Sequence, residues 1–353
     1  MKLMMYSDIH HGSAFEYGRL DSAGYNSRLI VSLSIEDWIT NLIAGHMPDV
    51  FIFMGDLMER SIYSYLNDMV RERIMYRFVK FPDVKFFYMV GNHDLYFKGT
   101  VDGKYVYGDV MNPLPNVIRT ASAMEYKGVK FGFLPWGTDQ LQDSVDYAFL
   151  HRDILGASMG YKTMTTGIEV SNIKAHRIFT GHIHIPQKLS NNAFCIGSTY
   201  PTELGECDGK ARGVWFYDTD TGSLTMEEPP FPKLTKVSVT TDNQKAIEQA
   251  LEEHRGNCII FNLITNDSSL AVWLHKNKDM LIQKYELENL EPIPTILEKD
   301  KTDMQVIKVL DQESMLKDFI SRSDTEGLDP KVLFETGMQL LNAGKAKVKD
   351  ADI

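Results

Sequence analysis

The stretch VKFFYMVGNHD, residues 84–94, decides how the fold is interpreted. It opens as an apolar run rich in aromatic and β-branched residues, which predicts a strand buried on both faces. At Gly91 the run gives way to an amide, an imidazole and a carboxylate, which are Asn92, His93 and Asp94. A buried strand that ends in a glycine turn presents such side chains at the carboxyl edge of a sheet, where the ligand sites of open α/β sheets gather.

The three polar side chains offer three different chemical roles. Asn92 can give a neutral oxygen to a cation, and His93 can donate a proton or a hydrogen bond. Asp94 can hold the His93 imidazole in one tautomer by accepting a hydrogen bond from it. A single motif of this kind is equally compatible with a polar turn after a core strand, so the rest of the chain must decide.

Composition and charge narrow the class of protein. With 353 residues, 43% of them hydrophobic, the chain can bury a sizeable core in more than one domain. No apolar run reaches membrane-spanning length, and no signal-peptide pattern follows Met1. Three scattered cysteines fit neither a disulfide framework nor a thiolate zinc site, which predicts a reducing, cytoplasmic compartment. The net charge of −11 argues against DNA binding by charge alone, although metal ions can supply local positive charge.

Four further predicted strands also end in polar residues. On an extended backbone, side chains two residues apart point the same way, so D-x-H and H-x-H pairs can each face one metal ion. Each motif alone could be a surface turn or a structural histidine. Five such motifs, each at the end of a strand in one α/β order, have no common explanation of that kind. The strands and their terminal residues are Lys2–Ser7 with Asp8 and His10, Val50–Met54 with Asp56, Val145–Leu150 with His151, and Arg177–Thr180 with His182 and His184.

These positions supply seven candidate metal ligands, too many for one ion. Two ions that share a bridging carboxylate would use them all. Imidazole, carboxylate and amide ligands without a thiolate suit manganese, iron or zinc. The seven are Asp8, His10, Asp56, Asn92, His151, His182 and His184.

The segments between these strands predict an alternating architecture. Ser34–His46 and Glu59–Val79 have the apolar spacing of helices that cover a sheet. Phe97–Pro115 mixes cations with aromatic residues, and is either an exposed hairpin or a DNA-contacting loop. Ala193–Ser198 and Gly213–Tyr217 predict strands of a second layer that leans towards antiparallel pairing.

Three domains are predicted, comprising residues 1–228, 233–292 and 305–353. The proline-rich stretch EEPPFP, residues 227–232, marks the first boundary, and EPIP, residues 291–294, marks a weaker second one. The middle domain is expected to be a small α/β unit made of strand 236–240, helix 243–253 and strand 258–263, completed by residues 270–275 and 281–285.

The C-terminal tail predicts two short amphipathic helices. Asp311 can cap a helix that runs to about Arg322, and Asp329 with Pro330 can start a second one that ends at Gly344. Both helices carry apolar stripes that they cannot bury on each other alone, so they pack either on a partner or back on the middle domain.

The order D-x-H, G-D, G-N-H-D, lone histidine and G-H-x-H resembles the motifs of the calcineurin-like metallophosphoesterases. Within that superfamily, the chain is similar to the SbcD branch, the bacterial and phage counterpart of the eukaryotic meiotic-recombination nucleases. Phage recombination endonuclease subunits resemble it best. The stretches that carry this similarity are SDIHHG (7–12), GNHDLY (91–96), LPW (134–136), GHIHIP (181–186), GSTYPTELGE (197–206) and RGVWFYD (212–218).

The resemblance implies a four-layer α/β sandwich, with two mixed sheets flanked by helices, a small α/β DNA-binding capping domain and a helical tail. It also implies a division of the ligands, with Asp56 bridging the two ions. Two such ions, about 3.5–4 Å apart, generate hydroxide at neutral pH. His93 would then protonate the leaving oxygen, supported by Asp94. One ion would be held by Asp8, His10 and His184, and the other by Asn92, His151 and His182.

The implied function is that of a manganese-dependent DNA nuclease subunit, a double-strand exonuclease and single-strand endonuclease. It would act as a homodimer with an SbcC-type coiled-coil ATPase in recombination and double-strand break repair, and the tail would grip that ATPase. A stand-alone phosphoesterase for nucleotides or phosphoproteins has no use for a cap and tail, and a non-catalytic scaffold would be expected to lose ligands. One departure is Glu59, where many relatives carry a histidine, so its part in orienting the DNA backbone stays open.

Overall fold

The structure is a computed structural model in which two compact units are distinguished. One consists of residues 1–236, 254–260 and 280–291, and the other of residues 237–253, 261–279 and 292–353. The residues that it describes are 1–12, 17–20, 24–59, 65–101, 104–107, 115–138, 140–141, 143–160, 162–202, 206–207, 210–297, 307–308, 316, 320, 329 and 331–339.

The first unit contains two six-stranded sheets, and the first of them holds the stretch that opened the sequence analysis. In it, β1, β2, β3 and β6 run parallel, while β13 pairs antiparallel with β1 and β14 antiparallel with β13. In spatial order the strands are β14 (Leu224–Glu227), β13 (Val214–Asp218), β1 (Lys2–Tyr6), β2 (Val50–Phe53), β3 (Lys85–Met89) and β6 (Val117–Ile118).

The second sheet has a parallel centre and antiparallel edges. Strands β8, β9, β10 and β12 are parallel, and β7 and β11 close the two edges in the antiparallel sense. The strands are β11 (Gln187–Lys188), β12 (Ala193–Cys195), β10 (Ala175–Thr180), β9 (Val145–Leu150), β8 (Val129–Leu134) and β7 (Ser122–Tyr126). The expectation that residues 193–198 and 213–217 share one antiparallel layer is therefore wrong, because β12 and β13 lie in different sheets.

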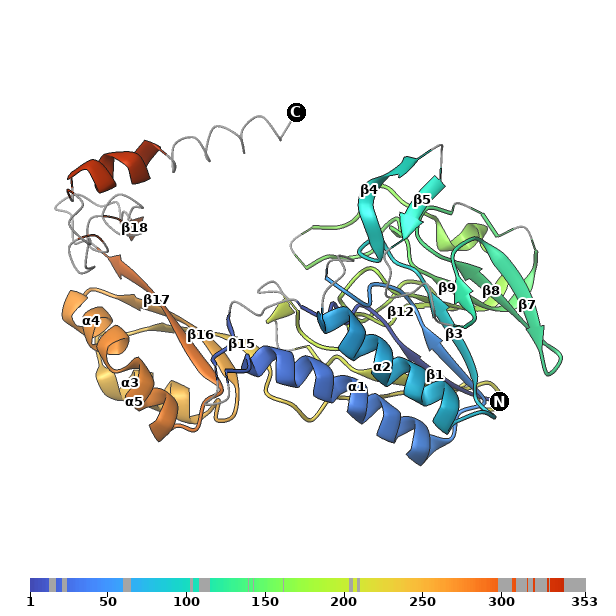
Figure 1. Cartoon of the computed structure of the whole chain (residues 1–353), viewed down its shortest axis with the longest axis horizontal. Coiled ribbons are helices and arrows are strands. Elements are labelled where there is room, and N and C mark those ends of the chain that lie inside the picture. Colours follow the sequence, from blue (N-terminus) through green and yellow to red (C-terminus); the bar gives the residue numbers. More distant parts are fainter. Residues whose placement is uncertain are drawn as a thin grey trace. The chain divides into compact units, whose positions relative to one another are not determined.

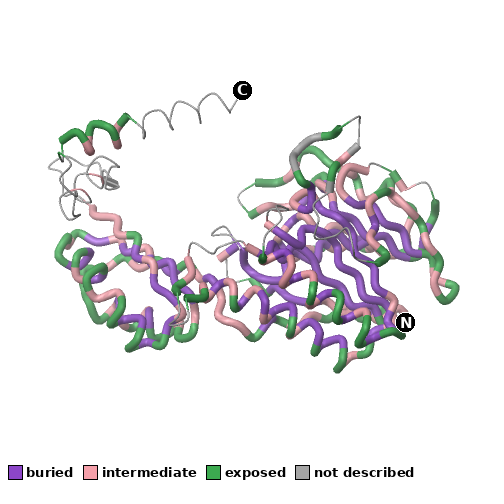
Figure 2. The backbone as a smooth tube through the Cα atoms, viewed as in Figure 1, coloured by how far each residue is buried: buried purple, intermediate pink, exposed green. Residues whose placement is uncertain are grey.

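The strands of the first sheet are buried on both faces, as their unbroken apolar runs predicted. Along β2, Val50 and Ile52 pack with the phenylalanines of the second sheet, whereas Phe51 and Phe53 face the helices. Figure 2 shows these strands as a continuous buried band. Since successive side chains alternate across a sheet, only a strand covered on both sides can be apolar at every position. The α/β fold class with mixed sheets and helices is thus confirmed.

Two helices cover the outer face of the first sheet (Figure 1). Helix α1 (Ser27–His46) begins earlier than predicted, because the Asn26 side chain caps it by accepting a hydrogen bond from the Arg28 amide. Helix α2 is described over Tyr65–Lys80, and residues 60–64 of the predicted helix lie outside the described residues. The outer face of the second sheet packs against Leu141 and against apolar residues between 154 and 173, including Val170 of the short 3₁₀ helix η3 (Val170–Asn172).

A buried ionic network ties these helices to the loop after β1. The Arg77 guanidinium binds the Glu36 carboxylate, and Glu36 Oε1 lies 2.7 Å from His11 Nε2. All three residues are almost fully buried. Burial alone would raise the pKa of Glu36, but Arg77 and His11 outweigh it and lower that pKa to about 2. The network therefore keeps Glu36 ionised beneath the residues that follow Asp8.

A two-stranded hairpin, β4 (Leu95–Val101) and β5 (Lys104–Tyr107), follows the GNHD motif directly (Figure 1). Tyr96, Val101 and Val106 are exposed on it. The hairpin alternative for residues 97–115 is confirmed, and contact with DNA stays a prediction. Residues 102–103 and 108–114 of that segment lie outside the described residues.

A third sheet has the order β15 (Leu234–Thr240), β16 (Cys258–Thr265), β17 (Asn289–Leu297) and β18 (Ile307–Lys308). Helix α3 (Gln244–Glu252) connects β15 to β16, and helices α4 (Ser268–Lys276) and α5 (Lys278–Lys284) lie between β16 and β17 in the sequence. Asn243 caps α3, as its place before an amphipathic run predicts. The residues EPIP, 291–294, lie within β17, and the division between the two compact units falls between Glu291 and Pro292. The limits of the predicted domains remain predictions.

Part of the C-terminal tail is described. Residues 331–339 are helical, and Asp329 caps them by accepting hydrogen bonds from the amides of Lys331 (2.8 Å) and Leu333 (3.0 Å). The predicted cap is thus confirmed. Leu316 packs on Gly337, where a Cβ atom would meet its Cδ2 at 2.6 Å. Asp311, Arg322, Pro330 and Gly344 lie outside the described residues. Among the described helices, none combines the length and apolarity that a bilayer crossing requires.

Candidate metal centre

The polar motifs that end β1, β2, β3, β9 and β10 lie together at the carboxyl edges of the first two sheets. Backbone hydrogen bonds from Asp8 N–H to Gly55 O (3.0 Å) and from His10 N–H to Asp56 O (3.1 Å) join the loops after β1 and β2. Gly55 has a φ of 106°, and a Cβ atom there would strike the His151 ring. Only glycine therefore allows this close approach.

Several ligand residues adopt left-handed backbone conformations that non-glycine residues seldom take. The φ angles are 50° at Asp8, 45° at His10, 58° at Asp56 and 71° at His182. Such conformations cost free energy, and they cluster where surrounding contacts fix a functional geometry. One such contact is the His182 amide, which donates to both carboxylate oxygens of Asp8 at 3.1 and 3.0 Å.

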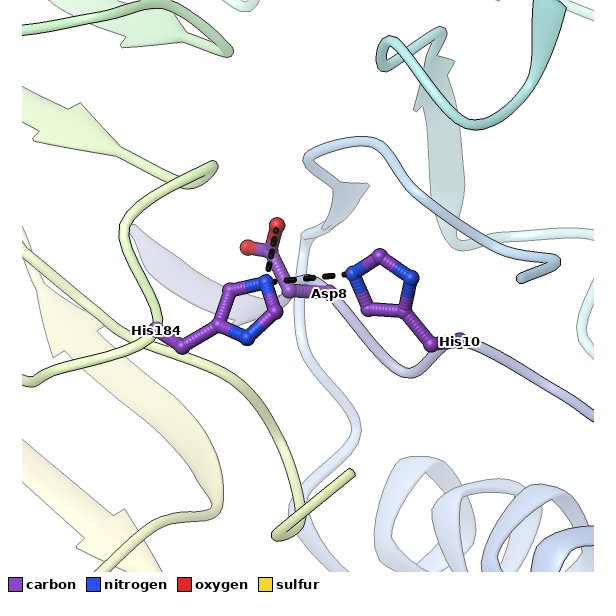
Figure 3. A group of neighbouring side chains, drawn as sticks. All are labelled: Asp8, His10 and His184. Atoms are coloured by element: carbon purple, nitrogen blue, oxygen red, sulfur yellow. Dashed lines mark hydrogen bonds and ion pairs between the residues drawn. The ribbon is translucent and has the colours of Figure 1, made fainter. Parts of the chain in front are cut away.

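The first ligand group consists of Asp8, His10 and His184 (Figure 3). The two Nε2 atoms of His10 and His184 lie 3.1 Å apart, and His184 Nε2 is 3.7 Å from Asp8 Oδ1. Two ring nitrogens and a carboxylate oxygen therefore converge on one point from the loops after β1 and β10. A divalent cation there would satisfy all three.

The second group consists of Asp56, His151 and His182, with the Asn92 amide oxygen between the rings. Asn92 Oδ1 lies 3.2 Å from His151 Nε2 and 2.9 Å from His182 Nδ1. Asp56 Oδ2 is 3.2 Å from His151 Nε2 and 3.6 Å from His10 Nε2 of the first group. One oxygen of Asp56 thus reaches both groups, as a bridging ligand must. The seven predicted ligands lie close together, and a third candidate group combines His10 and Asp56 with His93.

Three of the four histidines, His151, His182 and His184, have a hydrogen-bond acceptor against the ring nitrogen that faces away from the ligand group, and the fourth, His10, has a carboxylate close to that nitrogen. His10 Nδ1 lies 3.0 Å from Glu59 Oε2, and His184 Nδ1 contacts Glu206. His151 Nδ1 lies 2.7 Å from the Met54 carbonyl, and His182 Nε2 lies 2.9 Å from Asp153 Oδ1. Such partners fix the tautomer and make the other nitrogen a better ligand.

Asp153 and Glu206 were missed at the sequence level. Asp153 stands two residues after His151, a spacing that could have drawn attention to it. Glu206 ends the GSTYPTELGE stretch, and it is nearly buried. Its carboxylate also accepts hydrogen bonds from the Thr202 amide (2.7 Å) and the Ser198 hydroxyl (3.3 Å).

The carboxylates make the centre electrostatically suited to cations. Burial alone would lower the pKa of His184, but Glu206, Asp8 and Asp56 outweigh it and raise that pKa to about 10. In His151, burial is likewise outweighed, mainly by Asp56, and the pKa rises to about 9. Burial alone would raise the pKa of Asp56, but His151 and His10 hold it well below its usual range. The same negative charges that favour protonated histidines also favour the binding of divalent cations.

Asp94 has a different role from the one expected of it. Its carboxylate is fully buried and accepts hydrogen bonds from the amides of Gly91 (2.7 Å), Asp56 (2.9 Å) and Leu57 (3.0 Å). These bonds join the loops after β2 and β3. Burial and the nearby Asp56 raise the pKa of Asp94 to about 6. The expectation that Asp94 holds His93 is corrected, because all three bonds go to the backbone.

Glu59 takes the place that was expected for Asp94. Its carbonyl oxygen lies 2.9 Å from His93 Nδ1, and its carboxylate Oε2 lies 3.8 Å from the same nitrogen. The His93 ring meets the His10 ring edge-on, with centroids 4.7 Å apart, and its side chain is 31% exposed. His93 is therefore beside the first ligand group and accessible to a substrate.

The family model for calcineurin-like phosphoesterases matches residues 1–186, a span that includes all seven predicted ligands. The chain belongs to this family. Comparison with solved structures finds similarity to a dimetal phosphatase from Danio rerio, with 8% identity, 61% of this chain and 91% of that chain covered, and a TM-score of 0.34. A comparison with curated proteins gives no match.

Membership and geometry together make this chain a metallophosphoesterase whose clustered side chains suit divalent metal ions. Four imidazoles, two aspartates and one amide form a nitrogen and oxygen donor set without sulfur, which fits first-row divalent ions. Such ions polarise a phosphoryl group and activate water as a nucleophile. The protein's own part is to hold the ligands, to exclude competing tautomers and to place His93 at the rim.

Proposed function

We propose that this metallophosphoesterase is a manganese-dependent DNA nuclease subunit of the SbcD type. It acts as a double-strand exonuclease and single-strand endonuclease, together with an SbcC-type coiled-coil ATPase, in recombination and double-strand break repair. We further propose that it works as a homodimer. The seven ligands, His93 and the stretches that follow the last metal motif support this assignment.

One observation carries the choice of branch. The stretch 197–206 resembles the SbcD branch and lies beyond the metal ligands in sequence, and two of its described residues contact the metal centre or the residue before it. Glu206 contacts the His184 ring, and the Thr199 amide donates to the Ser7 carbonyl (3.0 Å) immediately before Asp8. These two contacts support the proposal that the SbcD-like stretch takes part in the function of the site.

His93 is proposed as the general acid for the leaving oxygen. The Glu59 carbonyl accepts from its Nδ1, which makes Nε2 the nitrogen for proton exchange with the substrate. The Glu59 carboxylate Oε2 lies 3.8 Å from the same Nδ1, on the side of the ring away from Nε2. This arrangement supplies proton transfer next to the first ligand group, where an oxygen leaving phosphorus needs it.

The nuclease assay should separate this function from the alternatives. Purified protein with manganese is assayed on blunt, nicked and single-stranded DNA, with and without the co-purifying ATPase, and His93→Ala is the control. Manganese-dependent cleavage that the ATPase stimulates is expected. Rapid hydrolysis of nucleotide monoesters or phosphopeptides without DNA cleavage would favour a stand-alone phosphoesterase. No hydrolysis of any phosphate ester would indicate a scaffold.

The tail is proposed to dock on the ATPase. Val332 is 58% exposed on the capped helix 331–339, which leaves an apolar side chain available to a partner. Deleting residues 305–353 should preserve manganese-dependent cleavage of short substrates and abolish partner co-purification. Val332→Glu should weaken co-purification, while the exposed Glu335→Ala serves as the matched control. Tight ATPase binding by the truncated protein would refute this role.

A further inference from the structure

Next to the second ligand group lie an indole and a guanidinium that the metal centre does not use. Trp136 follows β8, and its amide donates to the Val90 carbonyl (3.1 Å) just before GNHD. Its ring centroid is 5.0 Å from that of the ligand His182. Arg152 follows the ligand His151, and its Cζ lies 5.5 Å from the Trp136 ring centroid. Both side chains are partly exposed.

These two side chains are held in place. The Thr138 amide and hydroxyl both bind the Pro135 carbonyl, at 3.3 and 2.7 Å, and close the turn that carries Trp136. Gly137 has a φ of 82° and lies against the Tyr105 ring, which leaves no room for a side chain. A guanidinium over an indole is attracted by the ring electrons, so each side chain limits the motion of the other.

The charges around the centre make Arg152 significant. Glu59 beside the first group is an acidic residue at the rim with 34% exposure, and it would repel a neighbouring phosphate. On the other side, Asp153 is also acidic, but its carboxylate is engaged by His182. In a chain with a net charge of −11, the guanidinium next to the ligand His151 places a positive charge where a phosphate can approach it.

We infer that Trp136 and Arg152 form the binding site for the nucleotide next to the scissile phosphodiester. The guanidinium binds the adjacent phosphate, and the indole packs against the sugar or base. The strand therefore extends from the metal centre over the second ligand group, away from Glu59. This inference rests on the proposed nuclease function and adds the placement of the strand.

The test compares two substrates of the full-length manganese-loaded protein. One is a short single-stranded oligonucleotide, and the other is bis(4-nitrophenyl) phosphate, which has no neighbouring nucleotide. Arg152→Ala should lower the ratio of kcat/KM for the oligonucleotide to kcat/KM for the small diester by about tenfold, mainly through KM. It should also reduce the salt dependence of oligonucleotide binding by about one phosphate contact. Arg152→Lys should recover part of both effects.

Two further variants sharpen the comparison. Trp136→Ala should reduce the preference for an oligonucleotide with a base over one with an abasic flanking position. Arg177→Ala is the matched control, since Arg177 lies on β10 and donates to the Asn191 carbonyl. The ratio of the two kcat/KM values for this variant should equal that of the wild type. An unchanged ratio in Arg152→Ala, or an equal loss on both substrates, would overturn the inference. A wild-type protein that cleaves the small diester but no oligonucleotide would overturn the nuclease function, and this site with it.

Discussion

The two halves of the metal centre, which are its two ligand groups, differ in the groups that contact the outward ring nitrogens of their histidines. In the first half, the imidazoles of His10 and His184 are backed by carboxylates, Glu59 and Glu206. In the second, His151 is backed by a neutral backbone carbonyl, and His182 by Asp153, whose side chain is 39% exposed. Glu206, by contrast, is 7% exposed.

This difference has a physical consequence for ion binding. A buried carboxylate is poorly screened by solvent, so it raises the basicity of the ring that it contacts more than an exposed carboxylate or a carbonyl does. The second half also uses the neutral Asn92 amide as a ligand. We therefore expect the first half to hold its ion more tightly, and Asp56 to be the ligand on which both halves depend.

The largest effect is expected from Asp56. Asp56→Ala should remove both ions and lower activity by at least about 10⁴-fold, because the nucleophile that the ion pair generates is lost. Asp8→Ala should remove mainly the first ion. Metal analysis of both purified variants checks this difference. If Asp56→Ala kept one ion tightly bound, the bridging assignment would fail.

His93 should separate chemistry from metal binding. His93→Ala should lower kcat by about 10²–10⁴-fold, because proton transfer to the leaving oxygen is lost. Its metal content should stay near that of the wild type. Steady-state kinetics and metal analysis on the same preparation check both expectations. A near-normal rate, or loss of both ions, would contradict the role of His93.

The orienting carboxylates test the contrast between the halves directly. Glu206→Gln should weaken binding of the first ion by about 10- to 100-fold, and Asp153→Asn should weaken binding of the second ion by less, since Asp153 is more exposed. Titration of the metal-free variants with manganese measures each affinity. Equal losses in the two variants would show that burial of the partner does not set ion affinity here.

Glu59 should give the smallest change. Its carboxylate is 34% exposed, and its contact with His93 at 2.9 Å comes from the backbone, which Glu59→Gln retains. We expect a loss of up to about tenfold in affinity for the first ion, and a similar or smaller loss in kcat. A loss as large as that of His93→Ala would mean that the carboxylate itself takes part in proton transfer.

Local sequence determined the elements of the site. Polar residues directly after apolar strands mark the candidate ligands, because parallel strands end at a common edge of the sheet. The expectation that a D-x-H or H-x-H pair shares one direction on an extended backbone is wrong, because Asp8, His10 and His182 have positive φ angles, and His182 and His184 fall in different ligand groups. The same locality gave the Asn243 and Asp329 caps, since a cap acts on amides two or three residues ahead. All seven candidate ligands could be named from their places after apolar strands.

Only the tertiary structure decided which partners orient those ligands and how the strands are shared between sheets. Glu206 reaches His184 across 22 positions of sequence, and Asp94 bonds to Asp56 and Leu57 across 38 and 37. The separation of β12 from β13 likewise depends on pairing with β10 and with β1, respectively. No local pattern encodes such contacts, because the free energy that selects them comes from burial and pairing between distant segments.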